Sequence, residues 1–309
     1  YSVGGDVVIA ATQFGTNTVF GGNERENTAG EAQGGALFNI SPMRVTGCEF
    51  TGNRAEGGGY DHAKSADGNG GAIMNRGSLH VEQSFFKMNN AIGGHGHTSA
   101  LGQGGAIYNT NLLTVTDSSF EWNSAQGLTG EASFAPPSPA RGGALFTLQS
   151  CYLTNVSFSA NTAIGGNVLG GFVGNEQTPG NAFGGAIFVS GGGTLFLGNC
   201  TLSENEAIGG KGSPGGNNGM SFGGGICSTN ASVSLINTIL AYSKTGSNCF
   251  GALSDLGHNL SSDMSCNFNG PGSLNNTDPK LGPLGDYGGT TPTLPLLSGS
   301  PAIDGGDNA

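Results

Sequence analysis

The sequence predicts an all-β protein, a right-handed, single-stranded parallel β-helix of about seven coils with a C-terminal cap. Three observations lead to this fold class. Glycine makes up 60 of the 309 residues, only 10% of residues are charged, and two short motifs recur along most of the chain. So much glycine and so little charge exclude helical bundles and coiled coils. The 17 phenylalanines supply apolar surface for a packed core, which argues against a disordered linker.

The first motif is a pair of glycines followed by alanine or a substitute. Its copies begin at Gly4, Gly34, Gly70, Gly104, Gly142, Gly184 and Gly223. The second motif is Phe-x-x-Asn, which is degenerate in its last two copies. These copies begin at Phe20, Phe50, Phe86, Phe120, Phe158, Leu202 and Leu240.

Residues that recur once per coil stack as ladders in a parallel solenoid. We therefore expect a Phe ladder inside the solenoid and an Asn ladder at a sharp turn. The expected Asn ladder is Asn23, Asn53, Asn89, Asn123, Asn161 and Asn205.

Length varies between coils only in stretches rich in Gly, Ser and Asn, the composition of turns and exposed loops. Because these stretches recur at one point of the repeat, we expect them to leave one corner of the solenoid as a loop canopy. They span residues 56–69, 92–103, 126–141, 164–183 and 208–222.

The chain divides into repeats over residues 1–243 and an irregular C-terminal cap over 244–309, which breaks the repeat and is rich in proline. Cys249 and Cys266 in this tail are the best disulfide candidates. The other four cysteines lie in repeat segments, where small buried apolar residues are expected. They are Cys48, Cys151, Cys200 and Cys227.

The net charge of −11, with only 10 Lys and Arg, predicts that the protein binds neither nucleic acid nor anionic membranes. No apolar run approaches the roughly 20 residues of a membrane span, so no membrane insertion is expected. The chain begins at Tyr1 and starts directly on a coil, whose strand edges would be unpaired. We therefore expect the N-terminal coil to pair with another subunit or a missing segment.

Two family resemblances follow from these motifs. The paired GGA[IL] and Phe-x-x-Asn motifs of residues 4–243 resemble the repeats of chlamydial polymorphic outer membrane proteins, which implies a surface-exposed β-helix adhesin. The tail from Asn276, with Leu281-GPL and Gly299-SPAID, resembles the end of bacterial choice-of-anchor extracellular β-helix proteins. Both resemblances imply a secreted, extracellular or cell-surface protein.

The polar residues of the loops are the first candidate site. Neighbouring coils would bring Asp61 and His62 near His95 and His97, with Lys64 close by. If the protein is an enzyme, Asp61, His62, Lys64 and His95 would be catalytic. The alternatives are a metal site, which glycine-rich loops fix poorly, and a solvated loop. We predict no metal site and no cofactor; calcium stays open, although no RTX-type repeat is present.

Five residues are candidates for binding. His97, Glu131 and Arg141 belong to the loops, while Trp122 and Tyr242 lie on an outward stripe beside the Asn ladder. An exposed aromatic ring there suits stacking on a sugar face, and packing against a neighbouring loop is the alternative.

We therefore expect a surface binding, adhesion or structural module that recognises a polysaccharide or cell-surface glycan through the loop canopy. The alternative is a polysaccharide lyase or glycoside hydrolase, which would use a base with a cation or paired carboxylates.

Overall fold

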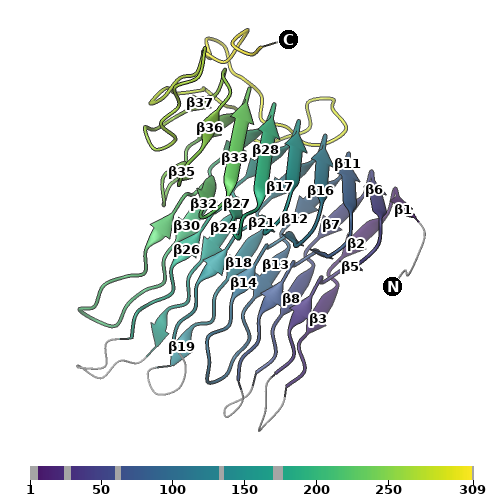
Figure 1. The fold of residues 1–309 in the computed structure, drawn as a ribbon, viewed down its shortest axis with the longest axis vertical. Coiled ribbons are helices and arrows are strands. Elements are labelled where there is room, and N and C mark those ends of the chain that lie inside the picture. The colour runs from purple at the N-terminus through teal and green to yellow at the C-terminus, as the bar shows by residue number, and fades with distance from the viewer. Residues whose placement is uncertain (1–5, 24–28, 60–63, 132–135, 170–176, 308–309) are drawn as a thin grey trace.

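The computed structural model describes residues 6–23, 29–59, 64–131, 136–169 and 177–307. Within these ranges the protein is all-β, and its parallel sheets stack as a β-solenoid of about six turns (Figure 1). The predicted parallel β-helix is thereby confirmed. No helix in the described ranges is long and apolar enough to cross a membrane.

Each coil passes through five sheets, which we number S1 to S5 in chain order, and a variable loop then leads from S5 to the next strand of S1. S1 contains β4 (Ala32–Gln33), β9 (Gly68–Asn69), β14 (Gly102–Gln103), β20 (Ala140–Arg141), β26 (Ala182–Phe183) and β31 (Ser221–Phe222). S2 contains β5 (Leu37–Asn39), β10 (Ile73–Asn75), β15 (Ile107–Asn109), β21 (Leu145–Thr147), β27 (Ile187–Val189), β32 (Ile226–Ser228) and β35 (Cys249–Phe250).

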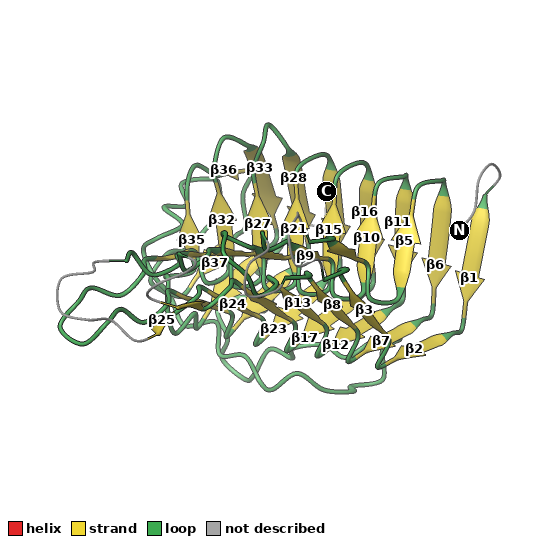
Figure 2. Ribbon diagram, turned by 90° about the horizontal axis from the view of Figure 1, so that it is seen from below, coloured by secondary structure: helices red, strands yellow, loops and turns green. Residues whose placement is uncertain are grey.

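The next two sheets complete the wall around the core, and Figure 2 shows their strands stacked in order along the solenoid axis. S3 contains β1 (Val7–Ala10), β6 (Met43–Thr46), β11 (Leu79–Glu82), β16 (Leu113–Thr116), β22 (Cys151–Thr154), β28 (Thr194–Gly198), β33 (Ser232–Ile236) and β36 (Ser254–Asp255). S4 contains β2 (Gln13–Gly15), β7 (Glu49–Thr51), β12 (Phe85–Lys87), β17 (Ser119–Glu121), β23 (Ser157–Ser159), β29 (Thr201–Ser203), β34 (Ile239–Ala241) and β37 (Leu260–Ser261).

The last sheet leads into the variable loops. S5 contains β3 (Thr18–Phe20), β8 (Arg54–Glu56), β13 (Asn90–Ile92), β18 (Ser124–Gln126), β24 (Thr162–Ile164) and β30 (Glu206–Ile208). Two loops also pair with each other through β19 (Gly130–Glu131) and β25 (Val168–Leu169). As predicted, the loops all leave one corner of the solenoid (Figure 1).

S2, S3 and S4 enclose the main core, which we call the body. Its centre is the predicted Phe ladder, in which successive rings stack in parallel with centroids 4.6–4.7 Å apart. Phe50, Phe86, Phe120 and Phe158 are completely buried. The strand alternation explains this, because each Phe is the middle residue of a three-residue S4 strand and points inward.

S1 and S5 pack face to face and form a second, thinner layer, which we call the fin. Only small side chains lie between them: Ala125, Ala163 and Ala207 from S5 meet Ala140 and Ala182 from S1. Because these side chains are so small, the backbones of S1 and S5 lie almost in contact. The fin projects from the body and carries the variable loops.

The two glycines of each GGA motif have different roles where the fin joins the body. Gly70 adopts a φ of +66°, a left-handed conformation that favours glycine. Gly71 does not adopt a positive φ, but a Cβ there would lie 2.1 Å from the carbonyl oxygen of Gly105 in the next coil. The first glycine serves the turn, and the second permits close stacking of coils.

The Asn ladder is buried at the turn from S4 to S5. In each step the backbone N–H and Nδ2 of one Asn donate to Oδ1 of the next, as from Asn89 to Asn123 at 3.0 and 2.9 Å. The same Nδ2 also donates to the carbonyl of a core Phe, such as Phe50. The ladder confirms Asn53, Asn89, Asn123, Asn161 and Asn205.

The predicted first copy of the repeat is wrong. Phe14 stacks on Phe50, and Asn17 donates to Asn53 Oδ1, so Phe14-x-x-Asn17 begins both ladders. Phe20 and Asn23 are exposed instead, because Val7 pairs with Met43 and this register places Phe20 beside Glu56. Gly4 lies outside the described residues, and the first described strand, β1, belongs to S3. The structure has about six turns, one fewer than the seven coils predicted.

Strands continue past residue 243, because β35, β36 and β37 add a partial coil to S2, S3 and S4. The predicted disulfide joins Cys249 to Cys266, and the other four cysteines are free and buried, as expected. Beyond them, residues 280–297 form an antiparallel tail arm, with Leu281 paired to Leu296. The arm reaches back along the solenoid, where Thr291 Oγ1 donates to the carbonyl of Asp117.

The first rungs have no strand before them in the described part of the chain. A cavity of about 400 Å³ opens there, lined by apolar residues that include Ile9, Leu37 and Met43. Pairing of this end with another chain stays a prediction.

Candidate binding surface

The predicted loop cluster is only partly visible. Asp61 and His62 lie outside the described residues. Lys64 and His95 are exposed on neighbouring loops, and the backbones of these loops touch, since a Cβ on Gly59 would meet the carbonyl of His95. His97 is half-buried in the same loop. Within the described ranges no group of three His, Cys, Asp or Glu side chains could hold a metal ion.

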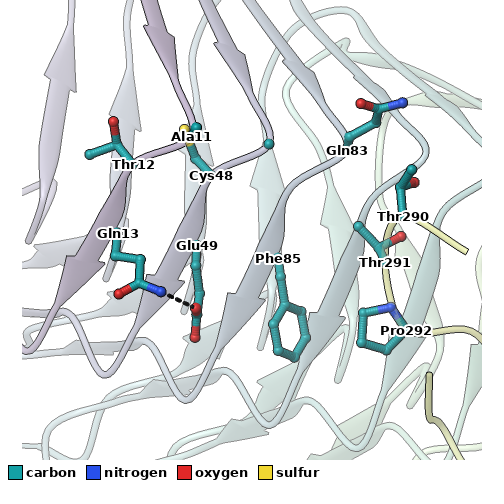
Figure 3. A pocket seen from close by; sticks show the side chains of 11 residues that line it. Ala11, Thr12, Gln13, Cys48, Glu49, Gln83, Phe85, Thr290, Thr291 and Pro292 are labelled. Carbon is teal, nitrogen blue, oxygen red and sulfur yellow. Dashed lines mark hydrogen bonds between the residues drawn. The ribbon is translucent and has the colours of Figure 1, made fainter.

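The outer face of S4 carries a different cavity, which sequence reasoning missed. Its volume is about 360 Å³, and it lies between the first coils and the tip of the tail arm (Figure 3). One wall consists of Gln13, Glu49 and Phe85 from three successive strands of S4, because strand alternation points these residues outward. The opposite wall is the tail segment 290–292.

Polar groups of this cavity are fixed by neighbours. Gln13 Nε2 donates to Glu49 Oε2 at 3.3 Å, the dashed line in Figure 3, and Thr51 Oγ1 donates to Glu49 Oε1 at 2.8 Å. The Glu49 carboxylate is therefore held by one neighbour from its own strand and one from the preceding rung.

A strip of aromatic and charged side chains continues from this cavity along S4. Lys87 Nζ lies 5.7 Å from the ring centroid of Phe85 and 4.7 Å from that of Trp122. The same ammonium group forms an ion pair with Glu121 at 2.9 Å. Trp122 remains 48% exposed, and we call Phe85, Lys87, Glu121 and Trp122 the S4 strip.

The exposure of Trp122 follows from the Asn-ladder turn. Trp122 has a φ of 51°, which a bulky residue rarely adopts. Met88, Ala160 and Tyr242 have similar φ values at the equivalent positions of other coils, so the turn and not the tryptophan requires this conformation. A residue in this conformation points away from the body, which places the indole ring at the surface.

Tyr242, the second aromatic candidate for binding, bonds to the tail and does not belong to the S4 strip. Its hydroxyl donates to Oδ1 of Asp278 at the base of the tail arm. Burial raises the pKa of Tyr242, and the hydrogen bond to Asp278 raises it further. The same bond lowers the pKa of Asp278. Tyr242 thus anchors the tail in this structure.

Arg141 is not a loop residue, although its position in the sequence suggests one, whereas Glu131 lies in a variable loop as predicted. Glu131 belongs to β19, and Arg141 belongs to β20 of S1 beside Gln103 of the preceding rung. Burial lowers the pKa of Arg141 and raises that of the nearby Asp67, although the Leu101 N–H opposes the second shift.

Alternation within the S4 strands could have identified Phe85 and Glu49, because each precedes a buried Phe. No sequence pattern places Thr290 and Thr291 at this cavity, since the tail reaches this face only through tertiary packing. Comparison of the sequence with protein-family models gives no match, and comparison with curated proteins gives none either.

Proposed function

We propose that the protein is an extracellular glycan-binding module and that its S4 strip, together with the adjoining cavity, is the binding surface. The observation that carries the proposal is the exposed ring of Trp122 beside Lys87, Glu121 and Phe85. An aromatic ring stacks on the apolar face of a sugar, while the charged and amide groups bond to its hydroxyls.

Rigidity also supports this surface over the loop canopy. The strip lies on strands whose register is fixed on both sides by neighbouring coils. Polar groups held in this way need little ordering when a ligand binds. The canopy has a separate cavity of about 270 Å³, which includes Thr178, Ser213 and Asn217, but none of the described residues that line it is aromatic.

The disulfide between Cys249 and Cys266 is consistent with an extracellular protein, because such bonds persist in oxidising compartments. We propose further that the protein is located at the cell surface, in line with the resemblance of its repeats to adhesins. Glycan binding at the surface would be the activity of such a module.

A panel of immobilised polysaccharides tests the proposal. We expect retention of the protein on at least one polysaccharide, with Trp122→Ala weakening the affinity about tenfold, roughly 1.4 kcal/mol. Tyr152→Ala is the matched control, because Tyr152 is an exposed aromatic residue on S3. Retention that is equal in both variants would contradict the assignment of the strip.

The same panel distinguishes binding from cleavage. Release of reducing or unsaturated ends that disappears in Lys64→Ala or His62→Ala would replace the binding module with a polysaccharide-cleaving enzyme. Absence of both retention and release on every polysaccharide would contradict both.

A further inference from the structure

The outer faces of S1 and S2 meet where the fin leaves the body, and their side chains form a separate cluster there, which we call the seam. The S1 side of the seam is one ladder of outward-facing residues. In rung order these are Gln33, Asn69, Gln103, Arg141, Phe183 and Phe222.

The half of the seam before Arg141 is polar and internally bonded. Gln103 Nε2 donates to Asn69 Oδ1 at 2.9 Å and to Asp67 Oδ2 at 3.2 Å. Asp67 Oδ1 accepts the backbone N–H of Leu101 at 2.7 Å. Gln103 and Asn69 are only 5% and 3% exposed, so this network is closed to a ligand.

The half after Arg141 is aromatic. Phe183 and Phe222 stack with centroids 5.1 Å apart, and Phe183 also contacts Phe188 of S2 at 5.5 Å. Phe183 and Phe222 are half-buried, so they present part of an apolar surface to solvent.

Arg141 lies at the boundary and forms no ion pair with a described residue, although the nearby Asp67 carboxylate acts to raise its pKa and its guanidinium lies 6.0 Å from the ring centroid of Phe188. The other two half-buried cations of the described chain form ion pairs, Arg54 with Glu56 and Lys87 with Glu121. No carboxylate of the described residues lies within 4.0 Å of the Arg141 guanidinium, and its buried Nε–H has no acceptor there. Its one hydrogen bond is a long one of 3.5 Å to Gln103 Oε1. Arg54 Nε is also buried without an acceptor, so what distinguishes Arg141 is that no described carboxylate pairs with its guanidinium.

We propose that the seam binds an organic carboxylate, with the acid group on Arg141 and the apolar body of the ligand along Phe183 and Phe222. The planar guanidinium donates in a fork that matches a carboxylate. Successive rungs lie about 4.8 Å apart, so a ligand whose apolar part begins one rung from its acid group fits this order. The site is independent of the S4 strip.

Calorimetry with 3-phenylpropionate and its neutral amide, 3-phenylpropionamide, tests the proposal on the whole chain. We expect the acid to bind at least tenfold more tightly than the amide, and Arg141→Gln to abolish that preference. Arg141→Lys keeps the charge but loses the fork, so it is expected to weaken binding of the acid several-fold. Phe222→Leu is expected to weaken both probes.

Arg44→Gln is the control, because Arg44 is an exposed cation on S3. Thermal melting of each variant establishes whether it is folded. If Arg141→Gln does not fold, Arg141→Lys provides the test. Equal affinities for acid and amide would overturn the proposal. Unchanged binding of the acid in Arg141→Lys, or an ordered water alone on Arg141 Nε in a crystal soaked with the acid, would overturn it as well.

Discussion

The body and the fin belong to the same coils but are filled in different ways. The body holds a column of stacked phenylalanines between three sheets, whereas the fin holds only alanine and glycine between two. The body therefore gains stability from apolar area, while the fin depends on close backbone approach. The difference shows that one repeat can specify both a core and a thin support for loops, through side-chain volume alone.

The largest effect is expected in the body. Phe120→Ala would remove the centre of the Phe column, and a completely buried Phe costs about 3–5 kcal/mol when truncated. Denaturant unfolding measures this loss. Trp122→Ala, at the turn that follows the strand of Phe120, is the control and should cost far less, because the Trp122 ring is half exposed. Equal losses would contradict the assignment of Phe120 to the core.

Removing one member of the Asn ladder is expected to cost about 3 kcal/mol. Asn123→Ala would remove the acceptor of the Asn89 backbone N–H, one of the two acceptors of Asn89 Nδ2 and the side-chain donor to the carbonyl of Phe86. Asn23→Ala is the matched control, since that exposed side chain accepts a single hydrogen bond from the described residues, that of the Gly59 N–H. Similar melting temperatures for the two variants would show that the ladder adds no stability.

The fin is expected to reject even one methyl group. In Gly102→Ala the new Cβ would lie 2.2 Å from the carbonyl oxygen of Gln126, so S1 and S5 must separate at a cost of about 1–3 kcal/mol. The new Cβ of Gly22→Ala would meet no described atom within 4 Å, so this variant is expected to be neutral. A stable Gly102→Ala variant would mean that the fin is more loosely packed than its backbone distances indicate.

Acid is expected to loosen the C-terminal cap before the body. Burial acts to raise the pKa of Asp255 and Asp263, but hydrogen bonds from Gly270 and Ser265, among others, lower both below the ordinary value of 3.8. Their contribution to stability is therefore present above pH 3.8 and is lost as the pH falls through the lower folded-state values.

Hydrogen exchange at Asn248 and Gly270, whose N–H groups bond to these carboxylates, would report the loosening. The double variant Asp255→Asn, Asp263→Asn should remove most of the pH dependence. An unchanged acid response in that variant would assign the effect to other groups.

The smallest effect is a gain in stability. Ala160 adopts a φ of 52° at the turn that precedes the Asn ladder, so Ala160→Gly should relieve strain and stabilise the protein by about 1 kcal/mol. Ala106→Gly, at a buried alanine for which no positive φ is recorded, should destabilise it. The two opposite signs in thermal melts would confirm that the turn requires a left-handed residue.

The regular part of the fold was readable from the sequence because equivalent residues occupy equivalent environments in every coil. Phe50 and Asn53 could be assigned to ladders before any coordinates, since several copies repeat the same spacing. The prediction of the first coil was wrong because two copies of the spacing overlap there. Phe14 and Phe20 both precede an Asn by three residues, and only the pairing of Val7 with Met43 distinguishes them.

The candidate sites were less predictable. Trp122 was identified from its place beside the ladder, while Asp61 and His62 of the predicted catalytic cluster lie outside the described residues. Arg141 was placed in a loop, yet it ends up in a strand beside an aromatic ladder. Glu49 and Phe85 line a cavity only because the tail arm crosses the outer face of S4, which no local pattern in the sequence predicts.

The sequence by itself determined the solenoid, its Phe and Asn ladders, the loop corner and the disulfide, because these features depend on spacing along the chain. The tertiary structure decided where the fin bends from the body, which side of S4 the tail covers and which half-buried cation of the described residues forms no ion pair. These depend on contacts between segments far apart in sequence, and no local pattern records them.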